Sequence, residues 1–170
     1  IQPFALSDWQ TNCFVVHSDN SSDCWIVDCG FEPAVLLDYI TENQLKPVRI
    51  VLTHAHVDHI GSLEHIHDLW PDVPILIHEA EKEFLDNPMF NLSAFMGQPI
   101  VAPAATKLLK HGDTLSFSIA QTAGPAANSR SAADAISTGI FTFDAPEVSA
   151  ATRAHGMIVV PECISIRNVS

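Results

Sequence analysis

The segment Thr53-His54-Ala55-His56-Val57-Asp58-His59 decides how this sequence is interpreted, because it places three of the chain's nine histidines within seven residues. It follows directly on residues 47–52, Pro-Val-Arg-Ile-Val-Leu, which form a nearly continuous apolar run. Runs of this kind are typical of strands that are covered on both faces. We therefore expect a buried strand that leads the chain into a turn rich in histidine.

The spacing of the polar residues in this turn predicts a metal site. Side chains two residues apart in an extended segment share a face, so His54 and His56 can point the same way. The turn that follows brings Asp58 and His59 to a neighbouring position. Neutral imidazole and carboxylate are ligands that Zn²⁺ prefers. We expect all four residues to bind metal.

One acidic residue upstream is a candidate partner for these histidines. Asp28 lies in Val27-Asp28-Cys29-Gly30, at the end of a second strand-like run. Carboxylates commonly orient a ligand histidine through its free ring N–H. The alternative interpretation is a strand-end aspartate that only accepts turn hydrogen bonds.

The surrounding sequence alternates between strand-like and helix-like segments. The predicted strands are residues 12–17, 24–29, 47–52, 74–78, 114–119, 140–143 and 157–160, and the predicted helices are residues 33–43, 63–70 and 79–85. The buried face of the second helix is predicted to comprise Leu63, Ile66, Leu69 and Trp70. Residues 87–97 are expected to form a capping loop or a short helix. This order predicts an α/β fold.

The composition is that of one acidic domain. The 170 residues are 47% hydrophobic, which is enough for a single core over residues 1–170. Eight Lys plus Arg against twenty Asp plus Glu give a net charge of −12, which disfavours nucleic acid and membrane surfaces and leaves a small-molecule substrate as the expected partner. No apolar run approaches the ~18 residues of a membrane-spanning helix, and the first residues lack the order of a signal peptide. A cytoplasmic protein is expected.

The remaining cysteines and histidines are given structural interpretations. Cys13, Cys24 and Cys29 lie in apolar strand-like runs and form no C-x-x-C pair, so we predict buried, reduced thiols. The histidines predicted to lie on the surface are His17, His65, His67, His78 and His111.

The histidine segment, together with its flanking sequence, resembles the metallo-β-lactamase fold superfamily, especially its glyoxalase II-like thioesterase branch. The resemblance rests on His-x-His-x-Asp-His after an apolar strand, on Val27-Asp28-Cys29-Gly30, and on Asn12-Cys13-Phe14-Val15-Val16. It continues through Glu79-Ala80-Glu81, residues 91–95 and His111-Gly112-Asp113-Thr114-Leu115. It covers the first 120 residues throughout.

This resemblance implies an α/β/β/α sandwich of two mixed sheets with helices outside and a metal site at one edge. In the family's terms His54 and His56 hold a first metal, and Asp58 and His59 hold a second. The aspartate that bridges the two metals corresponds to Asp144, at the end of Phe141-Thr142-Phe143-Asp144.

The chain departs from the family pattern in its second half. Pro125 stands where the family has its third histidine, and Cys163 stands where the last one is expected. A thiolate can itself bind zinc, although an ordinary thiol is the alternative interpretation of Cys163, and His155 is a reserve ligand. Residues 122–135 are rich in Ala, Ser and Asn, so we expect a shortened or degenerate C-terminal half.

The resemblance implies a hydrolase that uses one or two zinc ions, with iron or manganese as alternatives, and a thioester or a related ester or lactone as substrate. Asp58 is then also the catalytic residue that orients the attacking water. Two other functions stay open. One is an iron persulfide dioxygenase-like enzyme that uses His54, His56 and Asp144. The other is a metal-binding remnant without activity.

Overall fold

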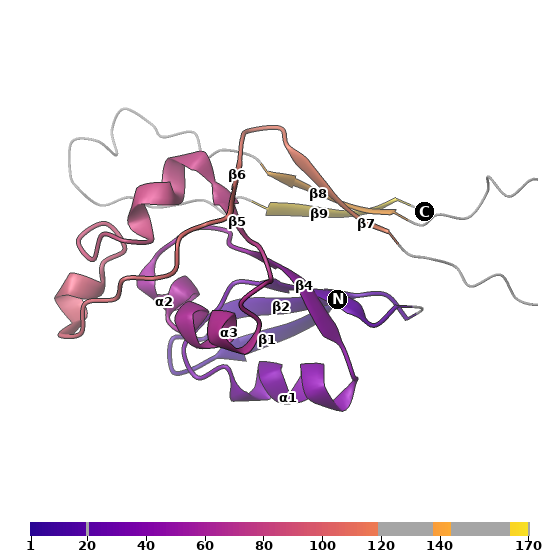
Figure 1. The fold of residues 1–170 in the computed structure, drawn as a ribbon, viewed down its shortest axis with the longest axis horizontal. Coiled ribbons are helices and arrows are strands. Elements are labelled where there is room, and N and C mark those ends of the chain that lie inside the picture. The colour runs from indigo at the N-terminus through magenta and orange to yellow at the C-terminus, as the bar shows by residue number, and fades with distance from the viewer. Residues whose placement is uncertain (20, 119–137, 144–163, 170) are drawn as a thin grey trace, which may run out of the picture.

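The computed structural model describes residues 1–19, 21–118, 138–143 and 164–169, which form two β-sheets and the helices that flank them (Figure 1). The strands are β1 (Gln2–Leu6), β2 (Thr11–His17), β3 (Asp23–Val27), β4 (Lys46–Val51), β5 (Ile75–His78), β6 (Lys107–Leu109), β7 (Thr114–Ser118), β8 (Thr138–Phe143) and β9 (Ile164–Val169). The helices are α1 (Ala34–Glu42), α2 (Val57–Ile60) and α3 (Leu63–Leu69), with the 3-10 helices η1 (Glu79–Phe84) and η2 (Ser93–Met96).

The first sheet is mixed and its strands follow chain order from β1 to β6. Strands β1, β2 and β3 pair antiparallel. Strands β3 to β6 pair parallel, with helices in the connections. The carboxyl ends of the parallel strands therefore meet at one edge of this sheet.

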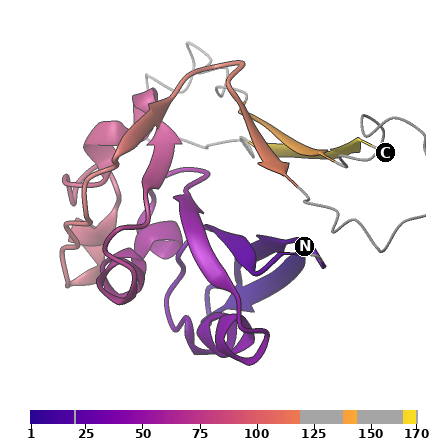
Figure 2. The ribbon, with the colours of Figure 1, turned by 45° about the vertical axis from the view of Figure 1, so that its right-hand side comes forward.

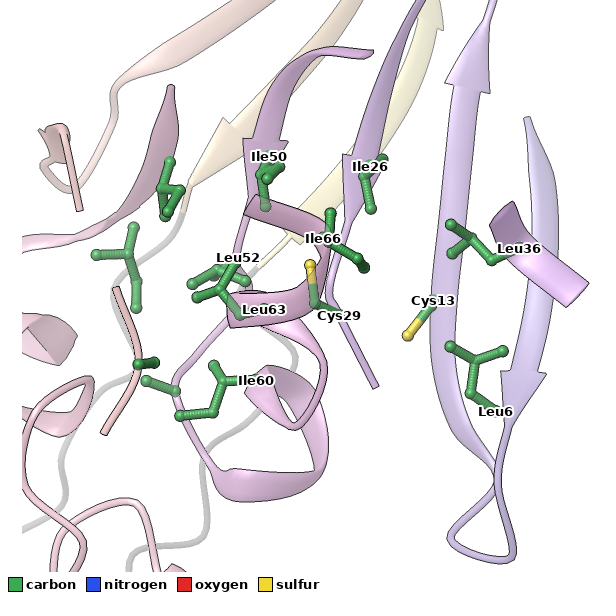
Figure 3. Packing of buried hydrophobic residues seen from close by; sticks show 14 of the residues in the cluster. Leu6, Cys13, Ile26, Cys29, Leu36, Ile50, Leu52, Ile60, Leu63 and Ile66 are labelled. Carbon is green, nitrogen blue, oxygen red and sulfur yellow. The ribbon is translucent and has the colours of Figure 1, made fainter. Parts of the chain in front are cut away.

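The central strands bury side chains on both faces, as the apolar run before His54 predicts. Along β3, Ile26 belongs to one core cluster and Val27 to the other. Along β4, Ile50 and Val51 divide in the same way, because successive side chains of a strand point to opposite faces. Figure 3 shows the first of these clusters, where Leu63 and Ile66 of α3 lie against residues of the sheet.

Each of the two clusters fills the space on one face of the first sheet. Helices α1, α2 and α3 lie on one face of the first sheet, and the second sheet, β7-β8-β9, lies beyond the other face (Figures 1 and 2). Leu115 of β7 is buried in the second cluster with Trp25 and Val51 of the first sheet. The predicted sandwich is thus confirmed, and the three described strands of its second sheet are antiparallel.

Several elements differ from the sequence-based expectations. Strands β1 and β6 and the short helix α2 were not predicted. The two strands are defined by their pairing with β2 and β5 rather than by a local apolar pattern. Leu69 was wrongly placed in the core and is 49% exposed, since it stands six residues, or about 120° around the helix, from Leu63. The predicted strand at residues 157–160 lies outside the described residues.

The three described cysteines are free and buried, as predicted. Burial raises the pKa of the Cys13 and Cys24 thiols to about 12 and raises that of Cys29 well above its usual value. None of the helices in the described part of the chain is long and apolar enough to cross a bilayer.

These thiols should resist modification while the chain is folded, because the thiolate is the reactive form and the folded structure suppresses it. In a Cys163→Ser chain treated with a thiol-specific disulfide reagent, we expect almost no reaction in buffer and reaction of all three thiols in denaturant. Rapid labelling of Cys13, Cys24 or Cys29 in buffer, located by peptide mass spectrometry, would contradict this packing.

Candidate metal centre

Three polar segments meet at the carboxyl edge of the first sheet. Asp28 follows β3, residues 53–59 follow β4, and Glu81 lies in η1, directly after β5. In open α/β sheets this edge is where ligands bind. The topology therefore brings together residues that are up to about fifty positions apart in the sequence.

The carboxylate of Asp28 organises the first turn of the histidine segment. Its Oδ1 accepts a hydrogen bond from the Thr53 backbone N–H at 2.8 Å, and its Oδ2 accepts one from Thr53 Oγ1 at 2.7 Å. Since the only hydroxyl proton of Thr53 is used in this way, Thr53 Oγ1 accepts from His54 Nδ1 at 3.0 Å. The Nε2 lone pair of His54 is left available to a metal.

The same carboxylate also contacts His59. His59 Nδ1 donates to Asp28 Oδ2 at 2.9 Å, so the predicted contact between Asp28 and a histidine of the segment is confirmed. The other ring nitrogen of His59, Nε2, lies 3.4 Å from Asp58 Oδ2. The neutral form of His59 thus carries its proton on Nδ1, which again leaves Nε2 for a ligand.

The three histidine rings gather closely. The ring centroids of His54 and His56 are 4.9 Å apart, and those of His54 and His59 are 3.9 Å apart. Burial, helped by the nearby His59 and His56 rings, lowers the pKa of His54 to about 3. Burial also lowers the pKa of His56, against the opposing charge of Asp58. Both rings are therefore neutral at physiological pH, as metal ligands must be.

His59 differs from the other two rings in its electrostatics. Burial by itself lowers its pKa, but the hydrogen bond to Asp28 and the charges of Asp28 and Asp58 outweigh that effect, so the pKa is raised. Asp58 is itself held by Thr11, whose Oγ1 donates to Asp58 Oδ2 at 3.2 Å.

A glycine allows the strand ends to approach this closely. A Cβ on Gly30 would lie 3.2 Å from Cys13 Sγ and 3.3 Å from the backbone oxygen of Asp58. Both are tighter than ordinary contacts, so a side chain at this position would push the histidine segment, residues 53–59, away from β2. This close approach explains why glycine ends the Val27-Asp28-Cys29-Gly30 run.

A buried acid supports the segment from the other side. Glu81 is 8% exposed, and its Oε2 accepts a hydrogen bond at 3.2 Å from the backbone N–H of Ala55, between His54 and His56. Burial raises the pKa of Glu81, while the Ala55 hydrogen bond and the nearby His78 act in the opposite direction.

The supporting roles of Thr11, Thr53 and Glu81 were missed by sequence reasoning. Thr53 directly precedes His54, and Glu81 follows the next parallel strand, so position alone could have suggested both. Nothing in the sequence around Thr11 signals its contact with Asp58.

The described residues include imidazole and carboxylate groups that can bind a metal, but they do not form a complete metal site among themselves. Within them, no three His, Cys, Asp or Glu side chains stand in an arrangement that could hold a metal ion. Asp144, together with Pro125, His155 and Cys163, lies outside the described residues.

The other histidines were only partly predicted correctly. His65 and His111 are exposed, as expected. Three further histidines are only partly exposed, so the surface prediction holds for them in part: His17, His67 and His78. His17 Nε2 lies 2.8 Å from the hydroxyl of Tyr39 on α1.

An open cleft of about 330 Å³ lies beside the segment. Val57, between His56 and Asp58, forms part of its lining, together with Trp9 of the β1–β2 turn. Two acidic residues, Asp8 and Glu32, also line it, and no Lys or Arg does.

Comparison with known proteins identifies the family and several relatives. The sequence matches the family model of the metallo-beta-lactamase superfamily over residues 6–161. The "Probable metallo-hydrolase YqgX" of Bacillus subtilis is 37% identical over 102 residues, which cover 59% of this chain and 47% of that protein. The "Hydroxyacylglutathione hydrolase" of Klebsiella pneumoniae is 40% identical over 71 residues, which cover 42% and 28%. The chain thus spans about half or less of the length of these relatives.

Solved structures show the same fold. The B3 metallo-beta-lactamase BLEG-1 matches with a TM-score of 0.68 and 26% identity, covering 98% of this chain and 66% of that one. TTHA1623, solved in a di-iron-bound form, matches with a TM-score of 0.57 and 26% identity, covering 70% and 60%.

The role of Asp28 can be tested with asparagine. Asp28 has a φ of 61°, a left-handed conformation that asparagine also tolerates, so Asp28→Asn removes the charge without adding backbone strain. The amide can no longer accept all three hydrogen bonds. We expect the metal-free protein to lose about 1–3 kcal/mol of unfolding free energy in urea denaturation. Asp38→Asn, on the exposed side of α1, is the control and should cost almost nothing. Equal effects of the two substitutions would show that Asp28 has no special role.

The support from Glu81 has a predictable pH dependence. Because the folded pKa of Glu81 is raised above its ordinary value of 4.5, the folded state binds the proton more tightly. This group therefore destabilises the fold increasingly as pH rises from 4.5 through the folded pKa. Glutamine can still accept from Ala55 N–H but carries no charge. We expect the stability of Glu81→Gln, relative to the parent, to increase as pH rises above 4.5 through the folded pKa of Glu81.

Glu81→Ala is the matched comparison, because it leaves the Ala55 N–H without an acceptor. It should be destabilised across the whole pH range in the same urea titrations. A Glu81→Gln chain whose stability relative to the parent does not change with pH would show that the carboxylate is not buried as the structure has it.

Proposed function

Because this chain belongs to the metallo-beta-lactamase superfamily, we propose that it is a metal-dependent hydrolase. Its metal ligands are His54, His56, Asp58 and His59, with Asp144 as the bridging carboxylate. The observation that carries the proposal is the way in which Asp28 and Thr53 occupy the Nδ1 positions of His54 and His59. Both rings are thereby oriented to offer Nε2 to the same edge of the sheet.

Each residue of the segment has a distinct part in the reaction. His54 and His56 are neutral donors, because burial keeps protons off their rings. Zinc, when bound, supplies the Lewis acidity that makes water nucleophilic near neutral pH and stabilises the developing oxyanion. Asp58, positioned by Thr11, accepts a hydrogen bond from the attacking water and aims it at the carbonyl carbon.

The substrate class that we propose is a thioester, or a related ester or lactone. The names of the Klebsiella pneumoniae and Bacillus subtilis relatives support a metallo-hydrolase and, within it, thioester hydrolysis. The carboxylates of Asp8 and Glu32 in the cleft beside Val57 disfavour polyanionic substrates. Zinc is the proposed metal. Iron and manganese are the alternatives, and the di-iron form of TTHA1623 is a reason to test iron.

The test is a pair of histidine variants. His56→Ala should weaken zinc binding by more than about 10-fold, because even the loss of an outer partner of a ligand costs about 10–100-fold. It should also abolish hydrolysis of a simple thioester such as S-acetyl-N-acetylcysteamine. Zinc is measured by mass spectrometry after equilibrium dialysis. His65→Ala, an exposed histidine of α3, is the control and should match the parent.

The same preparations separate the competing functions. Oxygen consumption with a persulfide substrate and iron, without thioester hydrolysis, would identify a dioxygenase. Metal retention without turnover of any ester or thioester would identify a non-catalytic remnant. Unchanged zinc binding in His56→Ala would show that the ligand assignment is wrong.

A further inference from the structure

Two aromatic rings extend outward from one of the proposed metal ligands. The ring centroid of Phe84 lies 6.4 Å from that of His56, and the centroid of Phe90 lies 5.5 Å from that of Phe84. These separations are those of interacting aromatic rings. Phe84 is half-buried and Phe90 is 45% exposed. The three rings therefore form a continuous aromatic surface that begins at His56 and ends in solvent.

A buried asparagine fixes this surface to the histidine segment, residues 53–59. Asn91 is completely buried, and its Nδ2 donates to the backbone oxygens of Phe84 and Ile100, each at 3.0 Å. The backbone oxygen of Asn91 accepts from Val57 N–H at 2.9 Å. Asn91, which directly follows Phe90, thus connects the backbone of Phe84 to the backbone of Val57 through hydrogen bonds.

The loop that carries Phe90 is strained and unusually apolar. Leu92 has a φ of 71°, a left-handed conformation that is costly for a bulky side chain. The large apolar side chains that the loop exposes are Met89, Phe90, Leu92, Phe95 and Met96. Five exposed large apolar side chains within one short, constrained loop are more typical of a binding site than of ordinary surface.

We propose that Phe84 and Phe90 bind an apolar acyl group of the substrate, such as an aryl group attached close to the scissile carbonyl. The proposal rests on the proposed hydrolytic function, which places the carbonyl beside His56. A group one or two bonds from that carbonyl then meets Phe84 first and Phe90 next. The cleft at Val57 is lined by neither ring and leaves room for the rest of the substrate.

The experiment compares two carboxylates that represent the acyl products, phenylacetate and acetate. Their binding to the chain is measured by titration calorimetry in the presence of zinc, together with hydrolysis of the matching N-acetylcysteamine thioesters. The parent should bind phenylacetate more tightly than acetate. Phe90→Ala should weaken phenylacetate binding by about 2- to 10-fold, the size of one aromatic contact, and leave acetate binding unchanged.

Two further variants serve as controls for the aromatic contact. Phe90→Tyr keeps the ring and should restore phenylacetate binding. Leu69→Ala removes a 49% exposed apolar side chain from α3, outside this loop, and should have no effect. Equal tightness for the two carboxylates in the parent, no loss in Phe90→Ala, or the same loss in Leu69→Ala would overturn the proposal. Selective phenylacetate binding without turnover of either thioester would uphold it and refute the hydrolytic function instead.

Discussion

The buried carboxylate of Asp28 is the interaction on which the rest of the site depends. It is 1% exposed, and it accepts hydrogen bonds from the Thr53 backbone, the Thr53 hydroxyl and His59 Nδ1. A buried charge is tolerated only when it is paired in this way. Because its partners all follow β4 while Asp28 itself follows β3, one carboxylate fixes the ends of two parallel strands and the orientation of two histidine rings.

The same principle recurs around the segment, because polar groups from other elements hold three more of its residues. Thr11 of β2 holds the Asp58 side chain, Glu81 of η1 holds the backbone at Ala55, and Asn91 holds the backbone at Val57. In the metal site that we propose, such support would hold the ligands in place before a metal binds and so lower the free-energy cost of ordering them.

The surroundings of the segment are chemically uneven, and this bears on substrate choice. One side presents the rings of Phe84 and Phe90, held by Asn91, and the cleft at Val57 carries two carboxylates and Trp9. For the hydrolase that we propose, an apolar surface and an acidic one next to the same side chains would favour a substrate with an apolar part and no polyanionic part. The net charge of −12 acts in the same direction over longer distances.

The sequence by itself determined the order of the main strands and helices, the burial of β4 on both faces, and the gathering of His54, His56, Asp58 and His59 in one turn. These follow from local patterns: apolar runs, helical spacing and short separations along the chain. Only the tertiary structure decided that Thr11 and Glu81 hold this turn and that Phe84 lies beside His56. Those contacts join residues from different strands and loops. They depend on how the strand ends meet at one edge of the sheet, and no local pattern records that meeting.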